Sequence, residues 1–246
     1  MPATPAWPPK SLPRLFVRTP LREGTLIDLD AGQANYLGNV MRLAAGSELL
    51  VFDGSSGEWL ATIAEAGKKR MVLSVERNIR EPERIPNVWL AFAPVKRAQT
   101  DWLVEKATEL GAARLLPVMT QRTVAERVKL ERLEAIAIEA AEQCGRTTLP
   151  EIAEPLPLAR FLDRRDASRT LYFADEGGGE HTSDAFRSGP ATILVGPEGG
   201  FTDEERAVVR AAPNAVPISL GPRILRAETA ALAALSAWMS AVGDWR

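Results

Sequence analysis

Two short apolar runs, each stopped by a Gly-Pro pair, constrain this sequence more than any other feature. Thr192–Val195 leads into GPEGG at positions 196–200, and Val216–Leu220 leads into GPR at positions 221–223. Each run fits one buried strand and is too short for a helix, and the Gly-Pro pair forces a turn. Open α/β sheets bind ligands beyond the carboxyl ends of their strands, so the two strand ends predict one ligand crevice.

The rest of the second half alternates strand-like and helix-like segments, which predicts a mostly parallel α/β sheet. The other predicted strands are Val88–Ala93, Arg114–Met119 and Leu171–Ala174, and the predicted helices are Gln99–Leu110, Arg127–Cys144 and Ala227–Val242. A further helix opens at Thr202, where Thr202 and Glu205 have the spacing of a capping box. The last helix is apolar on most sides, which predicts burial against the sheet or against a partner subunit.

The first half has a different pattern, with short strands separated by glycine-rich turns, and predicts a small β-barrel. Its strands are predicted at Arg14–Val17, Thr25–Leu29, Glu48–Phe52, Glu58–Ile63 and Met71–Glu76. One helix is predicted at Gln33–Leu43, with Leu37, Val40 and Met41 on its inner face. We expect a loose, proline-rich tail at residues 1–13 that is not a signal peptide, a barrel domain at 14–80, a linker within 78–87, and a second domain at 85–246.

Composition excludes several classes of function. The chain has one cysteine and one histidine, so we expect no internal disulfide, no metal site and no Ser-His-Asp triad. His181 lies in a polar glycine-rich stretch and is predicted to be an exposed loop residue. No apolar run is long enough to cross a membrane, and the lone cysteine fits a reducing cytoplasm. A net charge of −2 means that any RNA binding depends on local basic patches.

The glycine segments do not match the common phosphate-binding motifs. A Walker loop needs Lys and then Ser or Thr after its last glycine, and here Phe201 and Thr202 follow. A pair of tight structural turns is the plain alternative to a ligand site. Two such turns, each followed by charged residues and a helix, favour the ligand site.

The segments VGPEGGFTDEE and LGPRILRAETAAL resemble the two signature segments of the SPOUT methyltransferases, and most closely those of the RsmE type. Further segments agree: LGNVMRL, LLVFDG, VEKATELGA and AAEQCGR, so that the resemblance runs from about Arg14 onward. It implies a SPOUT-type sheet with a C-terminal trefoil knot, preceded by a small PUA-like β-barrel that binds RNA. It also implies a homodimer that methylates N3 of one uridine in 16S ribosomal RNA, within the 30S subunit.

The resemblance implies S-adenosylmethionine as the cofactor, bound by backbone groups and apolar side chains of the two segments. Glycine lets a backbone approach a ligand closely, and apolar side chains suit an adenine ring. The implied cofactor-binding residues are Leu194, Val195, Gly196, Glu198, Gly199, Gly200, Leu220, Gly221, Ile224, Leu225 and Arg226.

The chemistry places a second demand on the site, because uridine N3 becomes a good nucleophile only after it loses its proton. A cation beside the uracil carbonyls would stabilise the anion, and Arg226 is the first candidate. Glu228 and Thr229 are candidates for orienting the base or accepting the proton. The plain alternatives are an ion pair for Arg226 with Glu228 or Glu198 and a helix-start hydrogen bond for Thr229.

Six basic residues are candidates for contacting RNA: Arg42, Lys68, Lys69, Arg70, Lys96 and Arg122. Solvated surface charge is the plain alternative for these side chains. The sequence departs from the family pattern at Ala227, where a threonine is frequent, and at Arg97-Ala98, where a glycine and an acidic residue are usual. The first departure indicates that the threonine hydroxyl is dispensable, and the second puts in doubt a role for an acidic residue there.

Two other functions remain open on the sequence. One is a SPOUT-fold methyltransferase that acts on a different RNA base, and the other is a non-catalytic RNA-binding protein of ribosome assembly. The intact glycine segments and the Arg226-x-Glu228-Thr229 pattern favour an enzyme, because RNA binding alone does not need a cofactor site.

Overall fold

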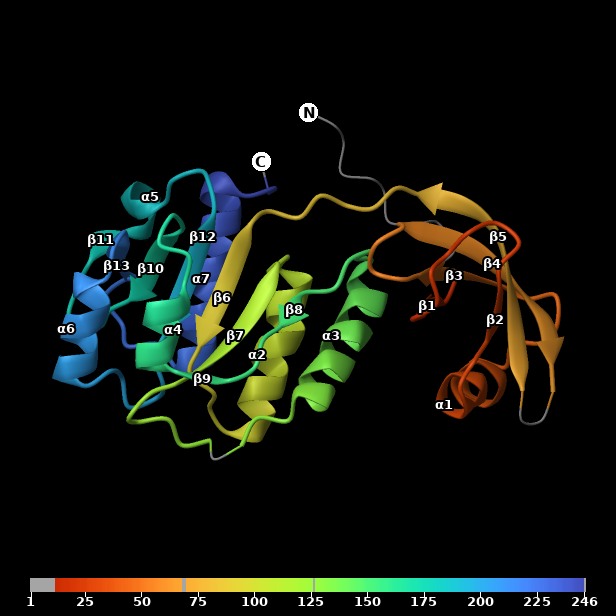
Figure 1. Cartoon of the computed structure of the whole chain (residues 1–246), viewed down its shortest axis with the longest axis horizontal. Helices are drawn as coiled ribbons and strands as arrows, with labels where there is room; N and C mark the ends of the chain where they lie inside the picture. The colour runs from red at the N-terminus through yellow and green to blue at the C-terminus, as the bar shows by residue number, and fades with distance from the viewer. Residues whose placement is uncertain (1–11, 68–69, 126, 246) are drawn as a thin grey trace. The chain divides into compact units, whose positions relative to one another are not determined.

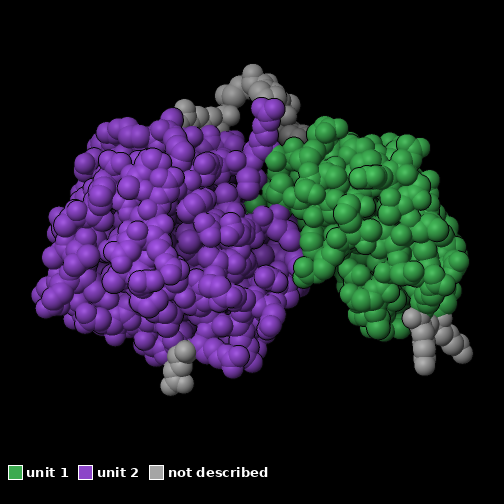
Figure 2. Space-filling view, in the orientation of Figure 1, with its two compact units in different colours: residues 1–83, 142–148 green, residues 84–141, 149–246 purple. Residues whose placement is uncertain are grey.

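The computed structural model describes residues 12–67, 70–125 and 127–245, and the chain divides into two compact units (Figures 1 and 2). Unit 1 comprises residues 1–83 and 142–148, and unit 2 comprises residues 84–141 and 149–246. The predicted linker at 78–87 begins inside a strand, because the last strand of unit 1 continues to Arg80.

Unit 1 is built on a five-stranded sheet with the order β1-β3-β4-β5-β2. The strands are β1 (Arg14–Phe16), β2 (Leu26–Asp28), β3 (Glu48–Phe52), β4 (Glu58–Ala66) and β5 (Met71–Arg80). β1 runs parallel to β3 and the other pairs are antiparallel, with register shifts between β4 and β5 that bend the sheet. Leu15, Leu49 and Leu73 contribute to its apolar core.

The helix predicted at Gln33–Leu43 is wrong in length and in its inner face. Helix α1 spans only Ala31–Asn35, and a π-helical turn, η1, follows at Tyr36–Val40. Leu37 is buried as predicted, but Val40 is 62% exposed and Met41 is 38% exposed. A π turn places more residues in each turn than an α-helix does, so the side chains that follow Leu37 rotate away from the core.

Unit 2 is built on a parallel sheet with the order β11-β13-β10-β12-β6-β7-β8, and β9 pairs with β7. The strands are β6 (Val88–Phe92), β7 (Arg114–Met119), β8 (Glu151–Ile152), β9 (Leu156–Pro157), β10 (Thr170–Ala174), β11 (Glu180–His181), β12 (Ala191–Val195) and β13 (Ala215–Ser219). All pairings recorded among these strands are parallel, which confirms the predicted α/β architecture.

Helices cover both faces of this sheet (Figure 1). One apolar core joins the sheet to α2 (Arg97–Glu109), α3 (Leu130–Cys144), α5 (Thr182–Ala185) and α7 (Ala227–Val242). The other core joins it to α4 (Leu158–Arg164) and α6 (Asp203–Ala211). The last helix, α7, contacts β12 and β6 and buries Leu235, Trp238 and Met239, so the sheet accounts for its apolar character.

Several elements were not predicted, namely the short strands β8, β9 and β11 and the helices α4 and α5. Helix α3 begins at Leu130 and not at Arg127, which leaves residues 127–129 in the connecting segment. The order of the strands does not by itself establish a trefoil knot, and the knot stays a prediction.

Candidate functional site

The ends of β12 and β13 lie at the same edge of the sheet, as the sequence predicted. Both strands pair in parallel with β10, which lies between them. The segments that follow, residues 196–201 and 220–225, line one cavity of about 310 Å³. A cavity of this size is at the lower end of the range for small-molecule sites.

The segment after β12 is held in place by contacts of its own. A Cβ atom added to Gly196 would lie 3.0 Å from the ring of Phe201, which is itself buried in the cavity wall. Gly200 has a φ of +67°, and its amide donates to the Pro197 carbonyl oxygen at 2.9 Å. This left-handed conformation favours glycine, so the GPEGG composition matches the backbone that the turn requires.

A capping box anchors the start of α6 beside the cavity. The Thr202 hydroxyl accepts from the Glu205 amide at 3.2 Å, and the Glu205 carboxylate accepts from the Thr202 amide at 3.0 Å. The other Glu205 oxygen accepts from the Gln121 amide at 2.7 Å, which ties the segment after β7 to α6. The predicted capping box is therefore confirmed, and its glutamate also holds a second segment of the site.

Carboxylates from the end of β10 form another wall of the cavity. Asp175 is paired with Arg206 at 3.4 Å and with Arg210 at 2.6 Å, and Glu176 is paired with Arg206 at 3.0 Å. Glu198 is exposed, and no basic group among the described residues lies within ion-pair distance of its carboxylate. Arg206 thus neutralises Glu176, and Glu198 places unpaired negative charge on the cavity wall, where a ligand carrying a positive charge would be favoured.

The segment after β13 is more open. Gly221 has a φ of +103°, and a Cβ atom added there would meet nothing within 4 Å. Ile224 is 82% exposed although it lines the cavity, and Arg223 is exposed too.

Helix α7 begins at the cavity, and its first residues include the predicted catalytic group. Arg226 occupies the N-cap position with an exposed side chain, and Thr229 is exposed. Glu228 is only 7% exposed, and its Oε2 atom has no hydrogen-bond partner among the described residues. Ala227, between Arg226 and Glu228, lines the cavity.

Most of the predicted cofactor residues line this cavity, namely Val195, Gly196, Glu198, Gly200, Leu220, Gly221, Ile224 and Leu225. Three do not. Leu194 is fully buried in the core beneath the site, the Gly199 carbonyl oxygen accepts from Arg122 Nη1 at 2.7 Å, and Arg226 lies at the end of α7 next to the lining.

Sequence reasoning missed the contribution of β10, whose end supplies Asp175, Glu176 and Gly178, and that of Arg206 on α6. The available signal was the polar stretch DEGGG directly after a predicted strand. His181 in the same stretch is exposed as predicted, but it ends strand β11 and is not a loop residue. Its ring nitrogen Nδ1 accepts from the Ser183 amide and caps α5.

The six predicted RNA-contacting residues lie in different settings. Arg42 is exposed in unit 1 with a φ of +57°, and Arg70 pairs with Asp28 at 2.7 Å, which raises the pKa of Arg70 through a direct hydrogen bond. Lys68 and Lys69 lie outside the described residues. Lys96 is exposed at the N-cap of α2, and Arg122 is bonded to the GPEGG segment.

Neither a metal-binding cluster nor a membrane-spanning helix is present among the described residues. No group of three or more His, Cys, Asp or Glu side chains is arranged to hold a metal ion. No described helix is both long enough and apolar enough to span a bilayer.

Comparison with known families identifies both units. Residues 81–239 match the family described as RNA methyltransferase domain, and residues 29–76 match the RNA methyltransferase PUA domain. The second match confirms that unit 1 contains the PUA-like module implied by the sequence.

The chain is similar along nearly all of its length to ribosomal RNA small subunit methyltransferase E of Rickettsia conorii. The two are 32% identical over 229 residues, which cover 91% of this chain and 93% of the relative. The protein of the same name from Bacillus subtilis is 29% identical, with 88% of this chain and 91% of the relative covered.

Solved structures give the same result. Ribosomal RNA small subunit methyltransferase E from Neisseria gonorrhoeae, bound to S-adenosylmethionine, superposes with a TM-score of 0.87 at 28% identity. A protein from Legionella pneumophila, in complex with the bound cofactor S-adenosylmethionine, superposes with a TM-score of 0.88 at 30% identity. Each comparison covers 96% of this chain and 100% of the solved chain.

Proposed function

This chain belongs to the RNA methyltransferase family, and on that premise we propose that it transfers a methyl group from S-adenosylmethionine to N3 of one uridine in 16S ribosomal RNA. The proposed target is uracil-1498 in the conventional rRNA numbering. The observation that carries the proposal is the cavity at the ends of β12 and β13, which is lined by both glycine segments and adjoins Arg226.

The residues present fit the proposed cofactor. Phe201 and Leu225 line the cavity with apolar side chains that suit an adenine ring, and Gly196 lies so close to the Phe201 ring that an added Cβ would be only 3.0 Å from it. Glu198, which is exposed and unpaired among the described residues, supplies negative charge for the positively charged groups of the ligand. When bound, S-adenosylmethionine supplies an electrophilic methyl group on a positively charged sulfur.

Arg226 is the proposed electrostatic catalyst. Its guanidinium is exposed at the N-cap of α7, directly before the cavity-lining residue Ala227. A uracil that reaches the cavity mouth would place a carbonyl oxygen beside this exposed cation. Loss of the N3 proton puts negative charge on that oxygen, and a positioned cation stabilises the charge as it develops.

Glu228 is the proposed proton acceptor. It is buried next to the cavity-lining residue Ala227 without lining the cavity itself, and its Oε2 atom lacks a hydrogen-bond partner among the described residues, which leaves an unsatisfied acceptor at the start of α7. The Glu228→Gln substitution keeps the shape and removes the basic oxygen. We expect a lower kcat and the loss of the acidic limb of the pH–rate profile. An unchanged pH–rate profile would mean that solvent, and not Glu228, accepts the N3 proton of the uridine.

The RNA partner is proposed to be 16S ribosomal RNA within the 30S subunit, with the PUA domain of unit 1 contributing to binding. Arg42, at the exposed end of η1, is the proposed RNA contact in that unit, and Thr229 is proposed to orient the base. We propose further that the enzyme is a homodimer, as the resemblance to the RsmE type implies, and that it is cytoplasmic, which the single cysteine favours.

The decisive experiment is a methyl-transfer assay with labelled S-adenosylmethionine and small ribosomal subunits that lack the N3 methyl group. Mass spectrometry of the product nucleosides should find N3-methyluridine at a single site. Methylation of another base would support the alternative methyltransferase, and cofactor binding without transfer to this RNA would point to another RNA substrate. If the protein neither bound S-adenosylmethionine nor transferred a methyl group, a non-catalytic RNA-binding protein would be favoured.

The Arg226→Ala variant tests the role of the cation. We expect transfer to fall by at least about a hundredfold, the range of losses seen when one positioned electrostatic group is removed. The Arg164→Ala variant is a matched control, since it removes an exposed arginine from α4, away from the cavity lining. If the Arg226→Ala and Arg164→Ala variants unfolded alike and Arg226→Ala kept near-normal turnover, Arg226 would have no role in the mechanism.

A further inference from the structure

Unit 2 contains a second cavity of about 340 Å³, similar in size to the proposed cofactor cavity. One wall is the segment that runs from the end of β6 into α2, including Val95, Lys96 and Arg97. The opposite wall is formed by the segment after β7 and the start of α3, including Arg127 and Lys129. Neither glycine segment contributes to its lining.

Its walls are held in a defined position. The buried Thr100 hydroxyl bonds both the amide and the carbonyl oxygen of Val95 at 3.1 Å, which fixes the turn between β6 and α2. Arg132 on α3 binds Asp101 on α2 through its Nε and Nη2 atoms, the shortest contact being 2.6 Å. This ion pair joins the two helices and neutralises Arg132.

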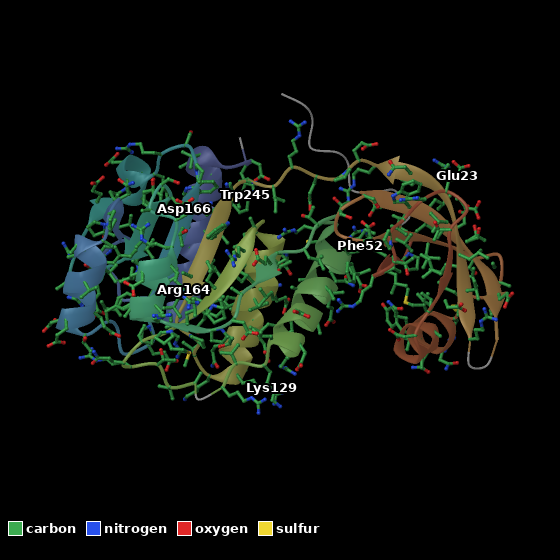
Figure 3. All side chains as sticks on the ribbon, in the orientation of Figure 1. Glu23, Phe52, Lys129, Arg164, Asp166 and Trp245 are labelled. Carbon is green, nitrogen blue, oxygen red and sulfur yellow. The ribbon has the colours of Figure 1, made fainter. Side chains whose placement is uncertain are left out.

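The cavity carries a surplus of positive charge. Lys96, Arg97, Arg127 and Lys129 are exposed, and none of them has a carboxylate within ion-pair distance among the residues described by the structure. Lys129, labelled in Figure 3, extends from the segment that precedes α3. Asp101 is the one acidic side chain in the described lining, and it is paired with Arg132.

Apolar side chains lie between these cations. Val95 and Leu133 are buried, Val128 is half-buried, and Val124 is 66% exposed. An apolar surface bordered by unpaired cations suits a ligand with a flat, weakly polar part and a phosphate. A nucleotide of a single-stranded RNA has both parts.

The two cavities begin at neighbouring strand ends. The Ala93 amide, directly after β6, donates to the carbonyl oxygen of Val195, the last residue of β12, at 2.9 Å. From there β6 leads to Val95 and Lys96 in the basic cavity, and β12 leads to Gly196 in the cofactor cavity. The segment after β7 also links them, since Arg122 bonds Gly199, and the basic cavity is lined by Val124, Ala125, Arg127, Val128 and Lys129.

We propose that this basic cavity binds a nucleotide of the RNA strand that flanks the methylated uridine. The base lies on Val95, Val128 and Leu133, and Lys96 and Arg127 neutralise the phosphates on either side. This inference rests on the RNA methyl transfer proposed above and extends it to a second contact on the same edge of the sheet.

The test uses the intact chain, unmodified 16S rRNA transcript as the probe, and the Lys96→Ala/Arg127→Ala double variant. Both side chains are exposed, so we expect unfolding and S-adenosylmethionine affinity to match those of the unaltered protein. RNA affinity should fall about tenfold or more, and the slope of log affinity against log salt should shrink by about 1 to 2, as expected when two phosphate contacts are lost. The Arg164→Ala variant should leave both quantities unchanged (Figure 3).

Unchanged RNA affinity and salt slope in the double variant would overturn this inference and leave the proposed function standing. If the double variant bound RNA more weakly but the unaltered protein transferred no methyl group, RNA binding at the basic cavity would be supported and the proposed function would be overturned. Uridine monophosphate serves as a second probe. If the variant lost binding of this nucleotide and kept its RNA affinity, the cavity would be a site for free nucleotides and the inference would be wrong.

Discussion

The two glycine segments that line the cofactor cavity differ in what holds them. The segment after β12 lies against Phe201, accepts a hydrogen bond from Arg122, and ends in the capping box of Thr202 and Glu205. The segment after β13 has an open Gly221, an exposed Arg223, and an Ile224 that is 82% exposed. Both line the same cavity, but the first is tied to other segments by hydrogen bonds, whereas the second is held by packing of Leu220 and Leu225 on the core and by one local hydrogen bond, from the Gly221 amide to the Ser219 hydroxyl at 3.4 Å.

This difference assigns separate roles to the two segments. A site fixed in the free protein binds its ligand without an ordering cost, whereas an open segment acquires its contacts on binding. Substitutions in the first segment should therefore lower both the stability of the free protein and its affinity for S-adenosylmethionine. Substitutions in the second should lower affinity and leave the free protein unchanged.

The largest effect is expected from Gly196→Val. The added Cβ would lie 3.0 Å from the ring of Phe201, a residue that lines the cavity, so the larger side chain must displace part of the cavity wall. Overpacking of this kind lowers the free energy of unfolding by about 1–3 kcal/mol. Affinity for S-adenosylmethionine, measured by calorimetry, should fall by at least about tenfold, which corresponds to about 1.4 kcal/mol.

The Gly196→Ala/Phe201→Leu double variant is the control, because the smaller side chain at 201 gives room for the new methyl group. It should recover stability relative to Gly196→Ala alone. Unchanged affinity in Gly196→Val would mean that the GPEGG segment is only a turn.

A smaller effect is expected from Gly200→Ala, because residue 200 has a φ of +67°. Alanine is disfavoured in this left-handed conformation, so the substitution should lower the free energy of unfolding by about 1–2 kcal/mol, as measured by chemical denaturation. Gly200→Asn is the matched variant, since asparagine tolerates this conformation and should be less destabilising. Equal losses in the two variants would assign the effect to the contact between the new Cβ and Glu176, which lies 2.5 Å away.

The next prediction concerns the capping box. Thr202→Ala removes the acceptor for the Glu205 amide and should lower the free energy of unfolding by about 1 kcal/mol. Thr202→Ser keeps the hydroxyl and should retain most of the stability. If the serine and alanine variants were equally unstable, packing of the threonine methyl group, and not the cap, would explain the effect.

The smallest effect on the free protein is expected from Ile224→Ala. Its side chain is 82% exposed, so the free energy of unfolding should change by no more than about 0.5 kcal/mol. The rise in thermal midpoint produced by saturating S-adenosylmethionine should be smaller than in the unaltered protein, because that rise depends on affinity. A clear loss of stability without ligand would contradict the division between the two segments.

Local patterns in the sequence predicted much of the site. Gly-Pro pairs after two apolar runs predicted the two cavity-lining turns, and the spacing of Thr202 and Glu205 predicted the capping box. These features depend on residues close together in the chain, where backbone chemistry decides the outcome. The same reasoning was wrong for Gln33–Leu43, because a π turn changed the helical period that the pattern assumed.

Contacts between segments that are distant in the chain could not be predicted from local sequence patterns. Asp175 and Glu176 line the cofactor cavity because β10 lies between β12 and β13, and Arg206 pairs with both carboxylates. Lys96 and Arg127 border one basic cavity although a helix and a strand separate them in the chain. Hydrophobic periodicity predicts which side of an element is buried, but it does not name the neighbouring element.

The sequence by itself determined that β12 and β13 end in glycine turns and that α6 begins with a capping box, since these features depend on local sterics and hydrogen bonding. Only the tertiary structure decided the order of the strands, and with it the composition of each cavity. It also decided that Glu228 is buried with one unpaired oxygen while Arg226 is exposed. The physical reason is that burial and charge pairing depend on neighbours brought together by the sheet, and that order is set by packing of the whole domain.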